Sequence, residues 1–81
     1  MAQINVKIPA SHVDRQIPVD LDRQTPIHIM FQLLQNGDAP TGGSIWKMKK
    51  TGRAEVLNYF RSLADNGIAD GDTVELDDFR L

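Results

Sequence analysis

The stretch NGIADGDTVEL, residues 66–76, puts two glycines and two aspartates into a tight bend that runs into an alternating segment. Glycine adopts backbone conformations that other residues resist, and aspartate side chains accept hydrogen bonds from N–H groups in a turn. Val74 and Leu76 then alternate with polar residues, which is the period of a strand with one buried face. The stretch predicts a structural turn followed by a final strand at about residues 73–77.

The other end of the chain shows the same period. Apolar residues alternate over residues 3–8 and again over residues 16–22, and each run predicts a strand. The linker between them is short enough for a hairpin. Pro18 cannot donate a ladder hydrogen bond, so we expect the second strand at a sheet edge. The predicted buried positions are Ile4, Val6, Ile8, Ile17, Val19 and Leu21.

A single helix is predicted at residues 26–36. Thr25 is a suitable N-cap, Pro26 suits the first helical position, and Gly37 can end the helix in the left-handed conformation. At about 100° per residue, one apolar stripe holds Ile27, Met30, Phe31 and Leu34. We expect that stripe to face the core, which leaves Ile29 exposed and Leu33 at the margin.

The middle of the chain is less regular. Residues 41–44 read as a loop, and residues 45–50 as a third strand with Trp46 and Met48 facing inward and Thr51-Gly52 closing it. The following segment allows two structures: a short strand over Glu55–Tyr59, which the preceding turn favours, or a helix over Ala54–Ala64.

Composition restricts the function classes. A chain of 81 residues predicts one domain, residues 1–81, without a large substrate cavity. The absence of cysteine excludes disulfides, thiolate nucleophiles and thiolate metal sites, and it suits the cytoplasm. A net charge of −2 from mixed signs does not indicate nucleic acid as a partner. No run approaches the roughly 18 apolar residues that cross a bilayer, so we expect a cytoplasmic protein without membrane insertion.

The order of elements predicts an α+β fold with a mixed sheet rolled around one helix. Within that order, the segment Ser62–Leu76 resembles the end of a ubiquitin-like β-grasp domain, a mixed four- to five-stranded sheet wrapped on one helix. The helix that starts at Pro26 and the third strand containing Trp46 resemble the YukD/EsaB group, the small ubiquitin-like proteins of type VII secretion systems.

The end of the sequence bears on how such a protein would act. Ubiquitin and the related sulfur carriers work through a terminal Gly-Gly, whereas this sequence ends with residues 77–81, DDFRL. It therefore resembles the non-conjugated branch, which acts by docking. Processing of a longer precursor stays open as an alternative.

Catalytic and metal-binding motifs do not match. Aligning Gly71 with the glycine of an EF-hand loop puts Ile68 at a ligand position, so we predict no metal site. Residues 42–44, Gly-Gly-Ser, lack the lysine of a phosphate-binding loop. His12 and His28 have no identifiable nucleophile beside them. We expect no enzyme activity, no cofactor and no small-molecule substrate.

Candidate binding residues lie on two surfaces. Alternation puts Ile45, Lys47 and Lys49 on the outer sheet face. The resemblance to a ubiquitin-like domain implies that the first and third strands flank the last. Ile29 and Leu33, at i and i+4 on the helix, form the second candidate. A solvated face with cross-strand ion pairs is the alternative for the sheet, and scattered exposed apolar residues for the helix. The remaining outward sheet positions are Asn5, Lys7, Asp20, Glu75 and Asp77.

The pair Tyr59 and Phe60 is a third candidate for partner binding. Alternation in a short edge strand would bury one of the two side chains, and packing in the core is the alternative to binding. Taken together, the sequence predicts a non-catalytic protein-interaction module, as expected for a cytosolic accessory or regulatory component of a bacterial type VII secretion system. Two alternatives remain: a small ubiquitin-like subunit of a multicomponent enzyme such as a diiron monooxygenase, and a processed ubiquitin-like modifier.

Overall fold

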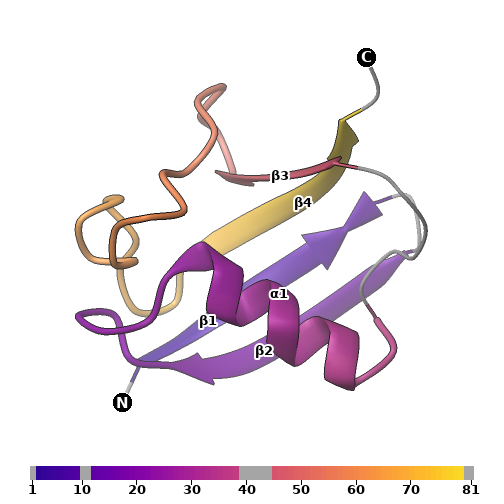
Figure 1. Ribbon diagram of the computed structural model, residues 1–81, viewed down its shortest axis with the longest axis horizontal. Helices are drawn as coiled ribbons and strands as arrows, with labels where there is room; N and C mark the ends of the chain where they lie inside the picture. The colour runs from indigo at the N-terminus through magenta and orange to yellow at the C-terminus, as the bar shows by residue number, and fades with distance from the viewer. Residues whose placement is uncertain (1, 10–11, 39–44, 80–81) are drawn as a thin grey trace.

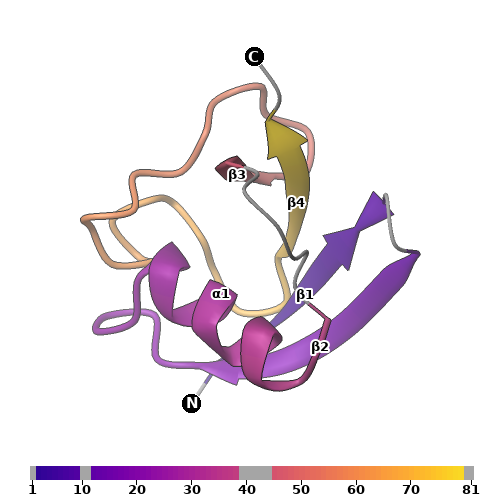
Figure 2. The same ribbon diagram turned by 45° about the vertical axis from the view of Figure 1, so that its right-hand side comes forward.

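The computed structural model describes residues 2–9, 12–38 and 45–79, which form a mixed sheet with one helix against it (Figure 1). The sheet order is β2-β1-β4-β3, and the helix lies across one face (Figure 2). The elements in chain order are β1 (Ala2–Ile8), β2 (Val13–Val19), α1 (Pro26–Gln35), β3 (Ile45–Lys50) and β4 (Thr73–Phe79).

The first and last strands meet in the middle of the sheet. β1 runs parallel to β4, with Val6 opposite Val74, and both side chains are buried. Each central strand pairs antiparallel with an outer one, β1 with β2 and β4 with β3. This confirms the prediction that the first and third strands flank the last. The core consists of Ile4, Val6, Ile8, Ile17, Val19, Ile29, Leu33, Met48, Leu57, Leu63, Ile68, Val74 and Leu76.

The second strand begins and ends three residues earlier than the sequence predicts. β2 starts at Val13, which lies opposite Ile8, and ends at Val19. The strand ends there because the Asp20 N–H donates to Gln24 Oε1 at 2.8 Å and the Gln24 N–H donates to the Asp20 carbonyl at 2.8 Å. That turn leaves Leu21 outside the sheet, half-buried against the core. The edge position expected from Pro18 is confirmed, because β2 is an outer strand.

The helix ends agree with the sequence signals. α1 begins at Pro26 after the N-cap Thr25, and Gly37 follows the last turn with a φ of +75°. The Thr25 Oγ1 atom lies 3.0 Å from His28 Nδ1, so this imidazole takes part in the helix start.

The predicted helix face is wrong. Ile29 and Leu33 are completely buried, whereas Phe31 is 59% exposed and Leu34 is 48% exposed. The reason is that α1 is apolar around most of its circumference and carries two overlapping stripes. Pro26, which is buried where the helix starts, shares a stripe with Ile29 and Leu33, and this stripe packs on the sheet.

Residues 51–72 contain neither of the two structures that the sequence allowed. The strand favoured over Glu55–Tyr59 is reduced to a single bridge between Val56 and Lys49, and no helix forms over Ala54–Ala64. Asn58 ends the extended part, since its Oδ1 accepts the Phe60 N–H at 3.0 Å. Leu57, Leu63 and Ile68 anchor the segment in the core.

Asn66, the first residue of the bend, ties this segment together. Its Oδ1 accepts the Asn58 N–H at 2.7 Å. Its Nδ2 donates to the carbonyl oxygens of Asn58 at 3.0 Å, Arg61 at 3.3 Å and Ser62 at 2.8 Å. One amide side chain therefore contacts four backbone groups of a segment that has no ladder of its own, with its two N–H donors shared among three carbonyl oxygens.

The bend itself is the structural turn that its sequence predicts. Gly67 and Gly71 have φ values of +78° and +83°, and Asp72 Oδ2 accepts the Ala69 N–H at 2.8 Å. The bend also attaches to β1, because Asp70 Oδ1 accepts the Gln3 N–H at 2.9 Å and the Gly71 N–H donates to the Gln3 carbonyl at 2.7 Å. Its aspartates thus serve the fold. The predicted loop at residues 41–44, with its Gly-Gly-Ser motif, lies outside the described residues.

Candidate protein-binding surfaces

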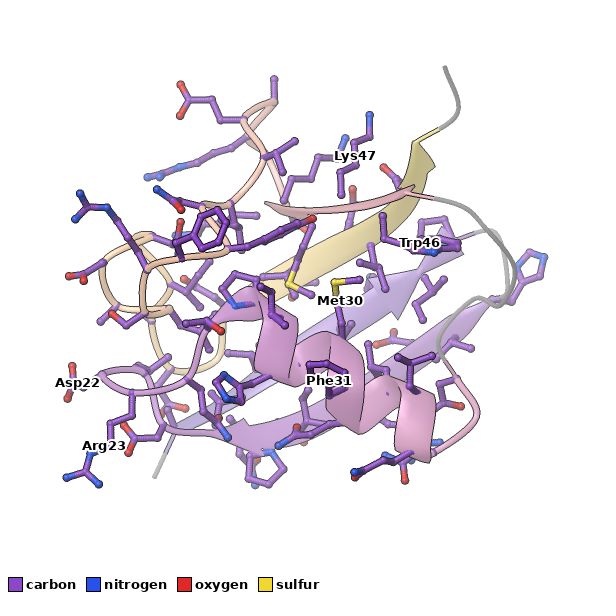
Figure 3. The ribbon with its side chains drawn as sticks, in the orientation of Figure 1. Asp22, Arg23, Met30, Phe31, Trp46 and Lys47 are labelled. Atoms are coloured by element: carbon purple, nitrogen blue, oxygen red, sulfur yellow. The ribbon has the colours of Figure 1, made fainter. Side chains whose placement is uncertain are left out.

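The outer face of the sheet carries a ladder of charges. Lys47 lies opposite Asp77, and Lys49 lies opposite Glu75, across the β3–β4 pair. The Lys49 Nζ atom is 3.6 Å from Asp77 Oδ2, with 27% and 32% of the two side chains exposed. Figure 3 shows Lys47 projecting from β3 on the side away from α1. We call Lys47, Lys49, Glu75 and Asp77 the sheet-face ladder.

Ile45, the remaining binding residue predicted on the sheet face, is only partly described. Ile45 starts β3 and lies opposite Phe79, but its side chain is outside the described part of the structure. Its role in binding stays a prediction.

The helical pair proposed from the sequence is not a surface. Ile29 and Leu33 lie in the core with no exposed area, so neither side chain can touch a partner while the domain is folded. The apolar surface of α1 is instead the stripe that the sequence placed inside.

That stripe forms part of a hollow. Ile27, Met30, Phe31, Leu34 and Tyr59 line a shallow depression of about 210 Å³, which we call the α1 groove. Phe31 lies in front of the α1 ribbon in Figure 3, on the side away from the sheet. Sequence reasoning missed this groove, because it placed the stripe of Ile27, Met30, Phe31 and Leu34 against the core.

Tyr59 forms the wall of the groove opposite α1. Its hydroxyl accepts the Met48 N–H at 2.8 Å and donates to the Trp46 carbonyl at 2.7 Å. Burial raises the pKa of Tyr59 above its ordinary value, and the bond from Met48 opposes that shift. Phe60 is 92% exposed, as expected if one of the pair packs inward.

Beside the ladder, Lys50 connects β3 to the bend. Its Nζ lies 3.0 Å from Asp72 Oδ2 and donates to the Gly67 carbonyl at 3.2 Å. The Ala69 N–H, and after it the Lys50 ammonium, hold the pKa of Asp72 below its ordinary value. This pair belongs to the support of the bend.

The described residues contain no group of three or more metal-ligating side chains. Among the same residues, no helix is long and apolar enough to span a membrane.

A mixed sheet with the first and last strands parallel at its centre, wrapped on one helix, is the ubiquitin-like β-grasp fold. Within that class, the chain belongs to the YukD family, described as protein YukD of the WXG100 protein secretion system (Wss), whose model matches residues 1–76. A comparison with curated proteins finds no match to the sequence.

Solved structures show the same fold at low identity. A chain of the toluene 4-monooxygenase HD complex with 4-bromobenzoate matches with a TM-score of 0.75 at 10% identity, covering 96% of this chain and 98% of that chain. The ubiquitin-like domain of the Mycobacterium tuberculosis type VII secretion protein ECCD1 matches with 0.60 at 20% identity, covering 95% and 99%. A ubiquitin-like protein from the archaeon Caldiarchaeum subterraneum gives 0.55 at 18% identity, covering 98% and 97%.

Proposed function

We propose that this protein is a non-catalytic interaction module and acts as a cytosolic accessory component of a type VII secretion system. The observation that carries the proposal is the family match over residues 1–76. The likeness in fold to the ubiquitin-like domain of ECCD1 supports it. In this proposal residues 1–81 work as one domain, and the partner is another protein of the secretion machinery.

The sheet-face ladder is the surface that we propose for this partner, with Ile45 beside it. Ion pairs on an exposed face contribute only about 0–1 kcal/mol each. Lys49 can therefore exchange its contact with Asp77 for a carboxylate of a partner at little cost. Such a face binds through charge complementarity, which favours fast and specific association.

The test compares two double variants in capture from the native host. Lys47→Glu with Lys49→Glu reverses the two ladder cations, whereas Arg23→Glu with Arg61→Glu makes the same charge change on exposed residues elsewhere. We expect the first pair to lose the partner and the second to retain it, with unchanged circular dichroism in both. Equal capture by the two variants would rule out the ladder as the docking surface.

A second candidate function is a non-catalytic subunit of a multicomponent enzyme, such as a diiron monooxygenase. The observation that favours it is the match to a chain of the toluene 4-monooxygenase complex over 98% of that chain's length. Gene neighbourhood separates the two candidates. Genes for a secretion ATPase and WXG-type substrates support the first, and oxygenase genes support the second.

A further inference from the structure

The chain contains two asparagine–glycine pairs, Asn36-Gly37 and Asn66-Gly67. Such a pair favours one spontaneous reaction, in which the backbone nitrogen of the second residue attacks the asparagine side-chain carbonyl. A glycine in second place has no side chain to obstruct the attack. The two glycines have similar backbones, with φ values of +75° and +78° and N–H groups that donate to a carbonyl at 3.1 and 3.0 Å. The glycines therefore do not distinguish the two pairs.

The two asparagine side chains do differ. Asn66 is half-buried, and its amide contacts four backbone groups within residues 58–62. Asn36 is exposed at the end of α1, and none of the described residues is hydrogen-bonded to its side chain. The attack requires the side-chain carbonyl to turn toward the next nitrogen. Asn66 has to give up its contacts before it can turn, and Asn36 does not.

The backbone also opens more easily at one of the two places. At both, the glycine N–H must leave its acceptor before it can react. Helix ends fray at little cost, whereas a segment anchored in the core opens only when that packing is disrupted. Asn36 directly follows α1, which ends at Gln35. Asn66 lies between Leu63 and Ile68, which are both buried in the core. The reactive conformation is therefore accessible to Asn36 in the folded domain and closed to Asn66.

We propose that Asn36 is a site of spontaneous deamidation in the folded protein, and that the contacts of Asn66 protect the second pair. The Gly37 nitrogen forms a bond to Asn36 Cγ while the Cγ–Nδ2 bond breaks, and the amide leaves as ammonia with the proton of the Gly37 N–H. Water then opens the resulting succinimide at either carbonyl and gives aspartate or isoaspartate. Water is the only co-reactant. This inference goes beyond the proposed function and does not depend on it.

The modification would change the end of α1. Either product adds one negative charge to a chain of net charge −2. The charge lies at the C-terminus of the helix, where the helix dipole makes a carboxylate unfavourable. Asp38 already places a carboxylate near this end, paired with Arg15. Leu34, which lines the α1 groove, lies in the last turn, so deamidation places a new charge close to that apolar surface.

The chain supplies its own internal control, because trypsin separates the two pairs. Cleavage after lysine and arginine leaves Asn36 in residues 24–47 and Asn66 in residues 62–80. The folded protein is incubated at mildly alkaline pH, and mass spectrometry follows the exchange of the amide for a carboxyl group in each peptide. We expect Asn36 to react at least about tenfold faster than Asn66. Labelling by an isoaspartyl methyltransferase should be concentrated in the first peptide.

The same incubation in urea removes the structure from both pairs, and the two rates should become similar. Asn36→Gln should abolish the reaction in the first peptide and leave the second peptide unchanged. A folded protein in which Asn66 reacts as fast as Asn36 would overturn the proposal. So would a folded protein in which neither pair reacts although both react in urea. A preference for Asn36 that persists in urea would also overturn it, because the preference would then come from the local sequence instead of the fold.

Discussion

The Tyr59 hydroxyl donates a hydrogen bond to the Trp46 carbonyl at 2.7 Å, joining residues 51–72 to the outer edge of β3. The same hydroxyl accepts the Met48 N–H at 2.8 Å, and the Leu57 N–H donates to the Met48 carbonyl at 2.8 Å. The Tyr59 hydroxyl and the Leu57 N–H thus satisfy backbone groups of Trp46 and Met48 that a fifth strand would otherwise pair. The edge of β3 is closed by a side chain, which also forms one wall of the α1 groove.

Removing this hydroxyl should destabilise the domain. Tyr59→Phe leaves the ring in place but strips a donor from Trp46 and an acceptor from Met48, which costs about 1–3 kcal/mol for groups left unpaired. Urea denaturation followed by the fluorescence of the single tryptophan measures the change. Phe60→Leu, on a fully accessible ring, should stay within about 0.5 kcal/mol. Equal stability of Tyr59→Phe and wild type would contradict the role of the hydroxyl.

Titration of Tyr59 should reflect the same contact. Burial raises its pKa above the ordinary value near 10. The stability that this gives is fully present below the pKa of the unfolded chain and is lost as pH rises through the raised, folded value. The chain has one tyrosine, so absorbance at the phenolate band follows it directly. The native protein should titrate at higher pH than the urea-unfolded protein; the reverse order would refute the burial.

At low pH, Asp72 should be a point of weakness. Its pKa lies below the ordinary value near 3.8, through the Ala69 N–H first and the Lys50 ammonium second. The stability it contributes is present above the unfolded pKa and is lost as pH falls through the lowered, folded one. In a carboxyl NMR titration, Lys50→Met should raise the Asp72 pKa without restoring the ordinary value, because the Ala69 bond remains.

Lys49→Met is the control for that titration, since Lys49 lies beside Asp77, at 3.6 Å. It should leave the Asp72 titration unchanged. An Asp72 that titrates at or above its ordinary value in the wild type would contradict the geometry of the bend.

The orientation of α1 predicts a large cost for one truncation and a small cost for another only two residues away, on the opposite side of the helix. Ile29→Ala opens a cavity in the core and should cost about 2–5 kcal/mol of unfolding free energy. Phe31→Ala removes a larger side chain but from the surface, where about 0.5 kcal/mol or less is expected. Denaturant melts of the two variants measure both values. The opposite ranking would mean that the helix packs through the stripe read from the sequence.

The sequence was sufficient to place β1, β3 and β4 because their alternation has one interpretation, whereas the strand favoured over Glu55–Tyr59 is only a single bridge. Ile4, Val6 and Ile8 alternate along β1, so all three face the same side of the sheet. The glycines and aspartates of the bend at residues 66–72 predict a turn directly before β4. The end of β2 was harder to predict. β2 ends at Val19 because the Asp20 N–H bonds to the Gln24 side chain. The apolar alternation continues to Leu21, so the sequence pattern gives no sign of this end.

The helix face and residues 51–72 could not be predicted for different reasons. With apolar residues around most of α1, periodicity does not distinguish the stripe of Ile29 and Leu33 from that of Phe31 and Leu34. Residues 51–72 are held by Tyr59 and Asn66, whose partners are distant backbone groups without a local pattern. The prediction of the candidate site succeeded or failed with these elements. Lys47 and Lys49 lie where alternation predicts, whereas Ile29 and Leu33 are buried.

Docking to a secretion component without covalent attachment is the central claim. Affinity purification of the tagged protein from its native host, followed by mass spectrometry of the intact bait and its companions, tests it most directly. We predict an unmodified bait that recovers a type VII secretion component. A bait covalently joined to another protein, or one that recovers oxygenase subunits instead, would contradict the account.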